Sequence, residues 1–258
     1  MNNLRVIRFA FFQQLKMAAA NLTSFALIAN NIPTAAMLAW IANSGSDARV
    51  LAHVAVGVFM MAVWNYTLFN VGWSLSGELF SGTLELSLIS RTPLVVVMFG
   101  KSIAVAAYGM VAGLAGLIGY FAVAQEVPEV ASLPLLILSI GIALLALITT
   151  TFMFAPFTVL YGGRAGFFNG IQPLGVALSG FLYPVSLLPT GLEIIGRLLP
   201  LSWGTDAILV SIRNGDLSRI VSDWALALLL TAGAFMVALL MFRAVERRLR
   251  VTGALGTF

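Results

Sequence analysis

Residues 133–160 have the sequence LPLLILSIGIALLALITTTFMFAPFTVL, in which no side chain is charged. About 20 apolar residues in a helix are enough to cross the roughly 30 Å hydrocarbon core of a bilayer. Because lipid offers the backbone no hydrogen-bond partner, a crossing segment must satisfy its own N–H and C=O groups, as a helix does. The stretch therefore predicts a transmembrane helix.

Similar apolar stretches recur along the chain of 258 residues, which is 60% hydrophobic and only 9% charged. A soluble domain carries roughly 25% charged residues, so water cannot be the main solvent of this protein. We predict an all-α membrane protein with one domain over residues 1–258. Its six predicted transmembrane helices cover residues 22–43, 50–73, 97–124, 133–160, 170–188 and 221–242.

The basic residues predict the orientation of these helices, because cytoplasmic loops are enriched in Lys and Arg. Of the 14 Lys and Arg residues, ten fall on one side of the predicted bundle and four on the other. Both termini and Arg164 are predicted to be cytoplasmic, whereas Asp47, Glu129 and Asp216 are predicted to be external. Termini on the same side of the cytoplasmic membrane require an even number of spans, which favours six over five or seven.

The segment before the first predicted span, residues 4–17, has its own pattern. On a helical wheel Arg5, Arg8 and Lys16 fall within roughly 80° of one another, although two phenylalanines interrupt this polar face. The pattern predicts a helix lying in the membrane interface. A cytoplasmic extension of the first span is the alternative.

Most kinds of catalytic or metal site are excluded by composition. The chain has no cysteine and a single histidine, His53, so thiolate or histidine metal clusters and His-dependent catalytic triads are not expected. Gly100-Lys101-Ser102 resembles the end of a phosphate-binding loop, but Val95 occupies the position of its first glycine. We therefore predict no enzyme activity, no metal and no bound nucleotide, and we interpret His53 as an interfacial residue.

The most informative segment is GELFSGTLELSLISRTP, residues 77–93, which connects the second and third predicted spans. On a helix the apolar residues of this segment form a stripe, and Glu78, Ser81 and Glu85 share another face. Such a helix can dock on a partner domain, or it can lie at the membrane surface. A glycine in an exposed helix destabilises the helix by up to ~1 kcal/mol relative to alanine. Gly82 therefore indicates a position where another part of a complex approaches the helix closely.

Residues Glu78, Gly82-Thr83-Leu84-Glu85, Leu88 and Pro93 resemble the coupling helix of type-2 ABC exporter permeases. Gly100-Lys101 continues the likeness after the proline. A second similar region comprises 180–184, Leu188-Pro189, Pro200 and Trp203, which resembles the fifth span and the external hairpin of that family. The two matches extend from the second span to the approach of the sixth.

The resemblance implies a permease subunit that pairs with a second permease chain and with two separate ATPase subunits, which would hold ATP and magnesium. The cargo would be amphipathic: a drug, a peptide, a lipid or a glycolipid. Residues 21–40 depart from the first span of O-antigen permeases, which favours the drug, lipid and peptide exporters. Contact with the ATPase is implied for Glu78, Phe80, Ser81, Gly82, Thr83, Leu84, Glu85, Leu88 and Arg91.

Residues 190–200 of the second similar region predict a short helix in the loop between the fifth and sixth spans. Thr190 and Glu193 have capping-box spacing, Glu193 and Arg197 are spaced for an i, i+4 ion pair, and Pro200 ends the helix. The helix is expected either to re-enter the outer leaflet or to pack on neighbouring loops.

Polar residues within the predicted spans need partners in lipid. Lys101 can snorkel to the cytoplasmic interface, or it can pair with Glu78 or Glu85 and so brace the coupling helix. Other polar residues either line a substrate pathway between two permease chains or join helices within one chain. The candidates for the pathway are Asn30, Asn31, Tyr66, Asn169, Gln172 and Tyr183.

Two other functions are compatible with a polytopic membrane protein. An ion-coupled secondary transporter normally has carboxylates near the bilayer midplane, where the predicted spans place none. An intramembrane enzyme needs a clustered acid, base and nucleophile or a set of metal ligands, which the sequence does not show. No nucleic acid is expected as a partner, because the basic residues lie at the ends of apolar segments.

Overall fold

The computed structural model describes residues 3–44, 48–80, 93–125, 128–160, 165–213 and 215–252. These residues form nine α-helices and one short 3₁₀ helix, without a β-strand. The elements are α1 (Asn3–Ala20), α2 (Leu22–Asn43), α3 (Ala48–Phe80), α5 (Leu94–Ala124), α6 (Leu133–Leu160), α7 (Ala165–Leu178), η1 (Val185–Leu187), α8 (Thr190–Leu198), α9 (Pro200–Arg213) and α10 (Leu217–Thr252).

Five of the described helices are long and apolar enough to cross a membrane, which is consistent with a multi-pass membrane protein. Their candidate spans are Leu22–Asn43, Arg49–Leu75, Leu94–Ala124, Leu133–Phe157 and Leu217–Arg248. Each contains or nearly coincides with one of the spans predicted from the sequence. The prediction of six continuous spans is not confirmed.

The difference lies in the predicted fifth span, residues 170–188. Helix α7 has 14 residues and ends at Leu178, so it rises only about 21 Å. Gly180 then adopts a left-handed conformation, with φ of 73°, and the chain turns before η1 begins at Val185. A single continuous helix over 170–188 is therefore wrong for this region.

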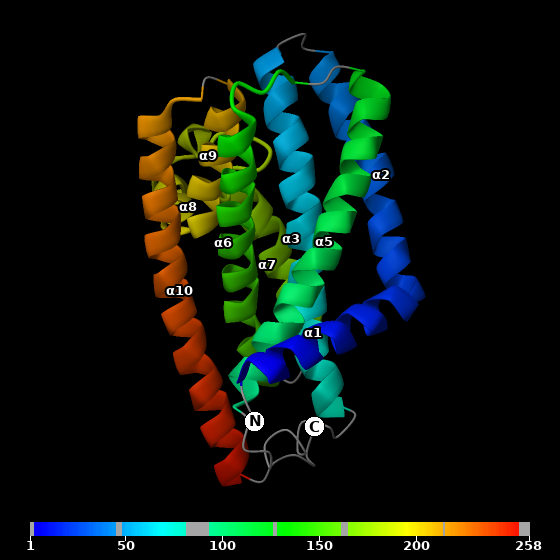
Figure 1. The fold of residues 1–258 in the computed structure, drawn as a ribbon, viewed down its shortest axis with the longest axis vertical. Helices are drawn as coiled ribbons and strands as arrows, with labels where there is room; N and C mark the ends of the chain where they lie inside the picture. The colour runs from blue at the N-terminus through cyan, green and yellow to red at the C-terminus, as the bar shows by residue number, and fades with distance from the viewer. Residues whose placement is uncertain are drawn as a thin grey trace.

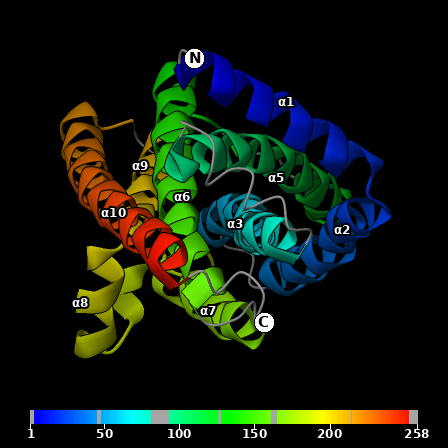
Figure 2. The same ribbon diagram turned by 90° about the horizontal axis from the view of Figure 1, so that it is seen from below.

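The helices share two ends, which we name by the position of α1 (Figure 1). Helix α1 lies crosswise at the α1 end, where α3, α6 and α10 finish and where α5 and α7 begin. Asn21 separates α1 from α2 and caps α2 by accepting a hydrogen bond from the Thr23 amide at 2.9 Å. The far end carries the opposite termini of the long helices together with α9 (Figure 1). Figure 2 shows α8 at the edge of the bundle, beside α10.

Helix α5 packs closely against three neighbours through glycines. A Cβ added at Gly100 would lie 2.6 Å from the Ile7 carbonyl oxygen of α1, and one at Gly119 would lie 2.2 Å from the Ile32 carbonyl oxygen of α2. Gly113 faces the Phe59 ring of α3 at a similarly short distance. Small residues allow helix backbones to approach closely in a membrane, where packing rather than water drives association.

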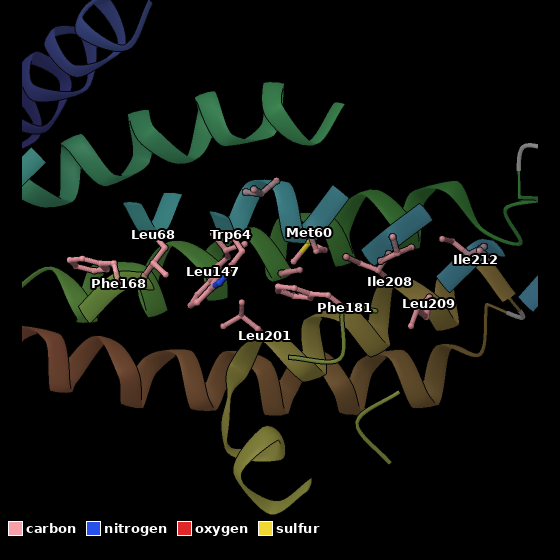
Figure 3. Packing of buried hydrophobic residues seen from close by; sticks show 14 residues of the cluster. Met60, Trp64, Leu68, Leu147, Phe168, Phe181, Leu201, Ile208, Leu209 and Ile212 are labelled. Atoms are coloured by element: carbon pink, nitrogen blue, oxygen red, sulfur yellow. The ribbon is translucent and has the colours of Figure 1, made fainter. Parts of the chain in front are cut away.

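A large apolar cluster joins α3, α6, α7 and α9. It holds the turn after α7 against the bundle, because Phe181 is fully buried within it. Figure 3 shows this packing, with residues of distant parts of the sequence side by side. Labelled there are Met60, Trp64, Leu68, Leu147, Phe168, Phe181, Leu201, Ile208, Leu209 and Ile212.

Candidate functional site

A buried ion pair joins α3 to α5 at the α1 end. The Lys101 Nζ donates to Glu78 Oε1, and the two side chains are only 5% and 13% exposed. A lysine inside an apolar helix needs such a partner, because an unpaired charge in the membrane costs about 2.5 kcal/mol or more. Lys101 therefore pairs with Glu78 in the structure and does not snorkel.

Most of the predicted coupling segment lies outside the described residues. This applies to Ser81, Gly82, Thr83, Leu84, Glu85, Leu88 and Arg91. Glu78 and the backbone of Phe80 belong to the last turn of α3, which runs without interruption from Ala48. Pro93 is the N-cap of α5. The segment therefore connects directly to the two helices that the ion pair joins, and its contact with an ATPase stays a prediction.

Two of the predicted pathway residues make contacts between helices of the chain. Tyr66 is 2% exposed, and its ring stacks on that of Tyr108 at 6.0 Å between centroids. The Gln172 side-chain amide donates to Asn65 Oδ1 at 2.7 Å, and the Gln172 carbonyl accepts from the Trp64 indole at 3.1 Å. Both residues thus connect helices, Tyr66 between α3 and α5 and Gln172 between α7 and α3.

The other four pathway candidates lie apart from these contacts. Asn30 and Asn169 are exposed, on α2 and α7 respectively. Asn31 donates to the Leu27 carbonyl at 2.8 Å, within its own helix. Tyr183 is half-buried in the turn after α7. Exposed amides on α2 and α7 suit contact with a partner chain or with lipid head groups.

His53 holds the turn after α7 in place. It is 4% exposed, and its Nε2 lies 3.0 Å from the Gly180 carbonyl oxygen. His53 thus has a structural contact within the protein that its interpretation as an interfacial residue did not include. Sequence alone did not show this, because the partner is a backbone group 127 residues away. The adjacent Phe181 carbonyl approaches Gly57, where a Cβ would lie 2.0 Å from the oxygen.

The region after this turn forms a hairpin of two helices rather than one. Thr190 is the first residue of α8, and Pro189 occupies the N-cap without a side-chain hydrogen bond, so the predicted capping box is absent here. Arg197 pairs with Asp206 of α9 instead of Glu193. Its guanidinium also lies over the Trp203 ring at 4.8 Å. These contacts fix α8 on α9.

The two helices of the hairpin differ in burial. Nearly all residues of α9 from Pro200 to Ile212 are buried, against α3, α6 and α10. Helix α8 instead exposes large apolar side chains on one side, which suits contact with lipid. These are Leu192, Ile194, Ile195 and Leu198.

A buried carboxylate of α10 is a residue that the sequence analysis missed. Asp223 is 5% exposed, and its Oδ2 has no hydrogen-bond partner among the described residues. Asp206 and Arg197 interact with it electrostatically from the hairpin. The signal in the sequence was an acidic residue at the start of a long apolar helix. Such a residue is common at an exposed helix end, and the sequence does not show that α9 packs beside it.

In comparisons with known proteins, no model of a protein family and no curated protein matched this chain. Within the described ranges, no three His, Asp or Glu side chains gather in the way that a metal ion would require.

Proposed function

We propose that this chain is the membrane subunit of an ATP-driven exporter of the type-2 ABC class. The observation that carries the proposal is the buried ion pair between Glu78 and Lys101, which joins the helices on both sides of the coupling segment. A partner that pushes on residues 81–92 would act on α3 and α5 together. Hydrolysis of ATP, with magnesium, would take place in separate ATPase subunits.

Long continuous helices support this mode of action. Helix α3 has 33 residues and α5 has 31, so each extends from the coupling segment to the far end. The closely packed glycines of α5 bring it against α1, α2 and α3. A displacement at the α1 end would therefore be carried by packed helices rather than absorbed by loops.

The proposal puts the α1 end in the cytoplasm and the far end outside. Arg5, Arg8 and Lys16 are exposed on α1, together with Phe9 and Phe12, as expected for a helix whose rings enter the interface while its cations stay in water. Helix α7 with the turn after it would serve as the fifth crossing, completed by the α8–α9 hairpin in the outer leaflet. The chain would then have six crossings.

A second permease chain, identical or different, would complete the translocation path, with two ATPase subunits on the cytoplasmic side. The exposed face of α2 offers large apolar side chains for that contact or for lipid. The cargo would be an amphipathic molecule, as the resemblance to the type-2 ABC exporters implies.

The test is the effect of the coupling segment on transport. Gly82→Leu and Glu85→Lys should leave insertion and thermal stability unchanged but abolish ATP-driven export in reconstituted vesicles that contain the copurified ATPase. Gly233→Leu in α10 is the matched control, since a Cβ at Gly233 would meet nothing within 4 Å and the residue lies outside the coupling segment. Export at the wild-type rate by both coupling variants would remove the main mechanistic support.

Asp223 favours a second candidate, an ion-coupled carrier. A buried carboxylate in a membrane helix is expensive unless it is paired, protonated or ligated, and carriers use such groups to bind protons or cations. Under this alternative, Asp223→Asn abolishes uptake or efflux driven by a proton gradient in vesicles without any ATPase. Under the exporter proposal, vesicles without an ATPase transport nothing, with or without this substitution.

A further inference from the structure

A cavity of about 710 Å³ opens at the α1 end, between α1 and the neighbouring ends of α2, α3 and α5. Cavities that bind drug-sized molecules have volumes of about 300–1,000 Å³. Its floor includes the Glu78–Lys101 ion pair. The sequence analysis did not predict this cavity, because it forms only where the crosswise helix α1 meets the bundle.

Apart from the ion pair, the polar part of the described lining is made of uncharged amides and hydroxyls. Gln13, Gln14, Asn70 and Ser74 all contribute. Ser74 Oγ donates to Gln14 Oε1 at 3.3 Å. Amides both donate and accept hydrogen bonds, so this lining suits a head group that does the same.

The described lining residues carry no net charge. Glu78 and Lys101 are its charged members among the described residues, and they neutralise each other. Helix α1 carries Arg5, Arg8 and Lys16, yet none of these lines the cavity. A phosphate or another charged head group would therefore enter without a counter-charge and would lose its hydration.

The apolar part of the lining opens toward the surface. Phe9, Met17 and Trp73 line the cavity and are 73%, 56% and 57% exposed. In a membrane these side chains would face acyl chains, and the rings could also stack on the apolar faces of a sugar. The cavity thus combines an uncharged, hydrogen-bonding interior with a lipid-facing mouth.

We infer that this cavity binds an amphiphile of the inner leaflet whose head group is uncharged and rich in hydroxyls, as in a glycolipid. Binding itself does not require the exporter proposal. The assignment of the bound molecule as cargo rests on the proposed function and narrows its substrate class to neutral glycolipids.

The test uses the whole chain in phosphatidylcholine nanodiscs, without an ATPase. The probe is a glucosyl diacylglycerol with a diazirine near the head of one acyl chain, compared with phosphatidylglycerol and phosphatidylcholine carrying the same diazirine. After irradiation, the glucosyl probe should label peptides containing residues 9–21 and 70–77 more than either phospholipid does. Equal or stronger labelling by phosphatidylglycerol would overturn the inference.

Variants connect the labelling to the cavity. Gln13→Leu together with Asn70→Leu should reduce it about tenfold, as expected for the loss of two hydrogen bonds. Gln13→Leu alone, at an exposed side chain, should give a smaller loss with an unchanged fold. Asn43→Leu is the control, an exposed amide at the far end of α2. Labelling that none of these cavity substitutions reduces would contradict the proposed site.

The cargo assignment has a separate readout. In vesicles with the copurified ATPase, added ATP reaches the complexes whose ATPase faces outward, so the glucosyl probe should move from the outer to the luminal leaflet, and the cavity variants should slow this. If the probe labels the cavity but ATP never moves it while another amphiphile is exported, the cargo assignment fails and the exporter proposal stands. If nothing is exported, the proposed function fails.

Discussion

The two ends of the bundle are built differently. At the far end, α9 is buried among α3, α6 and α10, and the turn after α7 lies directly on Gly57. At the α1 end, a crosswise helix leaves an open, amide-lined cavity above one ion pair. Close packing resists continuous deformation, so we expect the far end to move as a unit when the helices are displaced at the α1 end.

The largest difference between the two ends is expected in their accessibility from outside the cell, which shows which end faces the cytoplasm. Single cysteines in this cysteine-free chain, at Arg5→Cys and Glu129→Cys, can be treated with an impermeant maleimide in intact cells. Lys and Arg are concentrated at the α1 end, so we expect labelling of position 129 and none of position 5. Opening the cells should then expose position 5. Labelling of position 5 from outside would reverse the orientation.

The second largest effect, a loss of thermal stability, is expected when the Glu78–Lys101 ion pair at the α1 end is broken. Lys101→Met removes the cation of this pair, and removing one member of a buried pair costs about 3–5 kcal/mol. We therefore expect a large decrease in thermal stability, measured by size-exclusion chromatography of the heated, detergent-solubilised protein.

The double variant Lys101→Met with Glu78→Gln is the control for this prediction. It removes both charges, so most of the lost stability should return. A single variant as stable as the wild type would mean that the pair does not brace α3 against α5.

At the far end, Gly57→Val should prevent the turn after α7 from docking. The added Cβ would lie 2.0 Å from the Phe181 carbonyl oxygen, a backbone atom that cannot rotate away. Overpacking of this kind costs about 1–3 kcal/mol, and the same thermal assay should detect it. Gly141→Val is the matched control in α6, where a Cβ meets nothing within 4 Å. Equal melting temperatures for the two variants would contradict the packing at this end.

The smallest effect is expected at the start of α10. Asp216 Oδ1 accepts hydrogen bonds from the Ser218 hydroxyl at 2.8 Å and the Ser218 amide at 3.1 Å. The Ser218 hydrogen bonds and that of the Arg219 amide hold the Asp216 pKa below its ordinary value of 3.8. The cap therefore contributes its full stabilisation of the folded state above pH 3.8, and this contribution is lost as the pH falls through the lowered pKa.

Asp216→Ala should accordingly lower the melting temperature slightly at pH 7, and the difference from the wild type should shrink in strong acid. Ser222→Ala, one turn further along α10, is the control for a change of exposed polar side chain. A difference that persists unchanged at low pH would mean that the cap does not depend on the carboxylate.

Hydropathy was sufficient to predict the long helices, since α2 and α6 have the bounds expected from their apolar stretches. It failed at α7 and α9 for physical reasons. Gly180 and Pro184 break the apolar run after Leu178. Helix α9 contains Ser202, Thr205 and Asp206 and so resembles a loop, although it is buried by long-range packing that a local pattern does not contain.

The candidate sites were predictable only in part. Pairing of Lys101 with Glu78 was one of the alternatives, because a buried lysine must have a partner. The Arg197–Asp206 pair was missed, since the nearer Glu193 had suitable helical spacing and the hairpin geometry was unknown. His53 and Asp223 were missed for the same reason: their surroundings come from distant segments.

The central claim, that residues 78–92 contact a separate ATPase, is tested most directly by cross-linking in native membranes. Gly82→Cys and Gly191→Cys, the latter in the α8 helix, are each treated with a short photoreactive maleimide in the otherwise cysteine-free chain. We predict that position 82 gives an adduct with an ATPase subunit, identified by mass spectrometry, and that position 191 gives none. An active transport complex in which position 82 yields no ATPase adduct, or yields no more than position 191, would contradict the account.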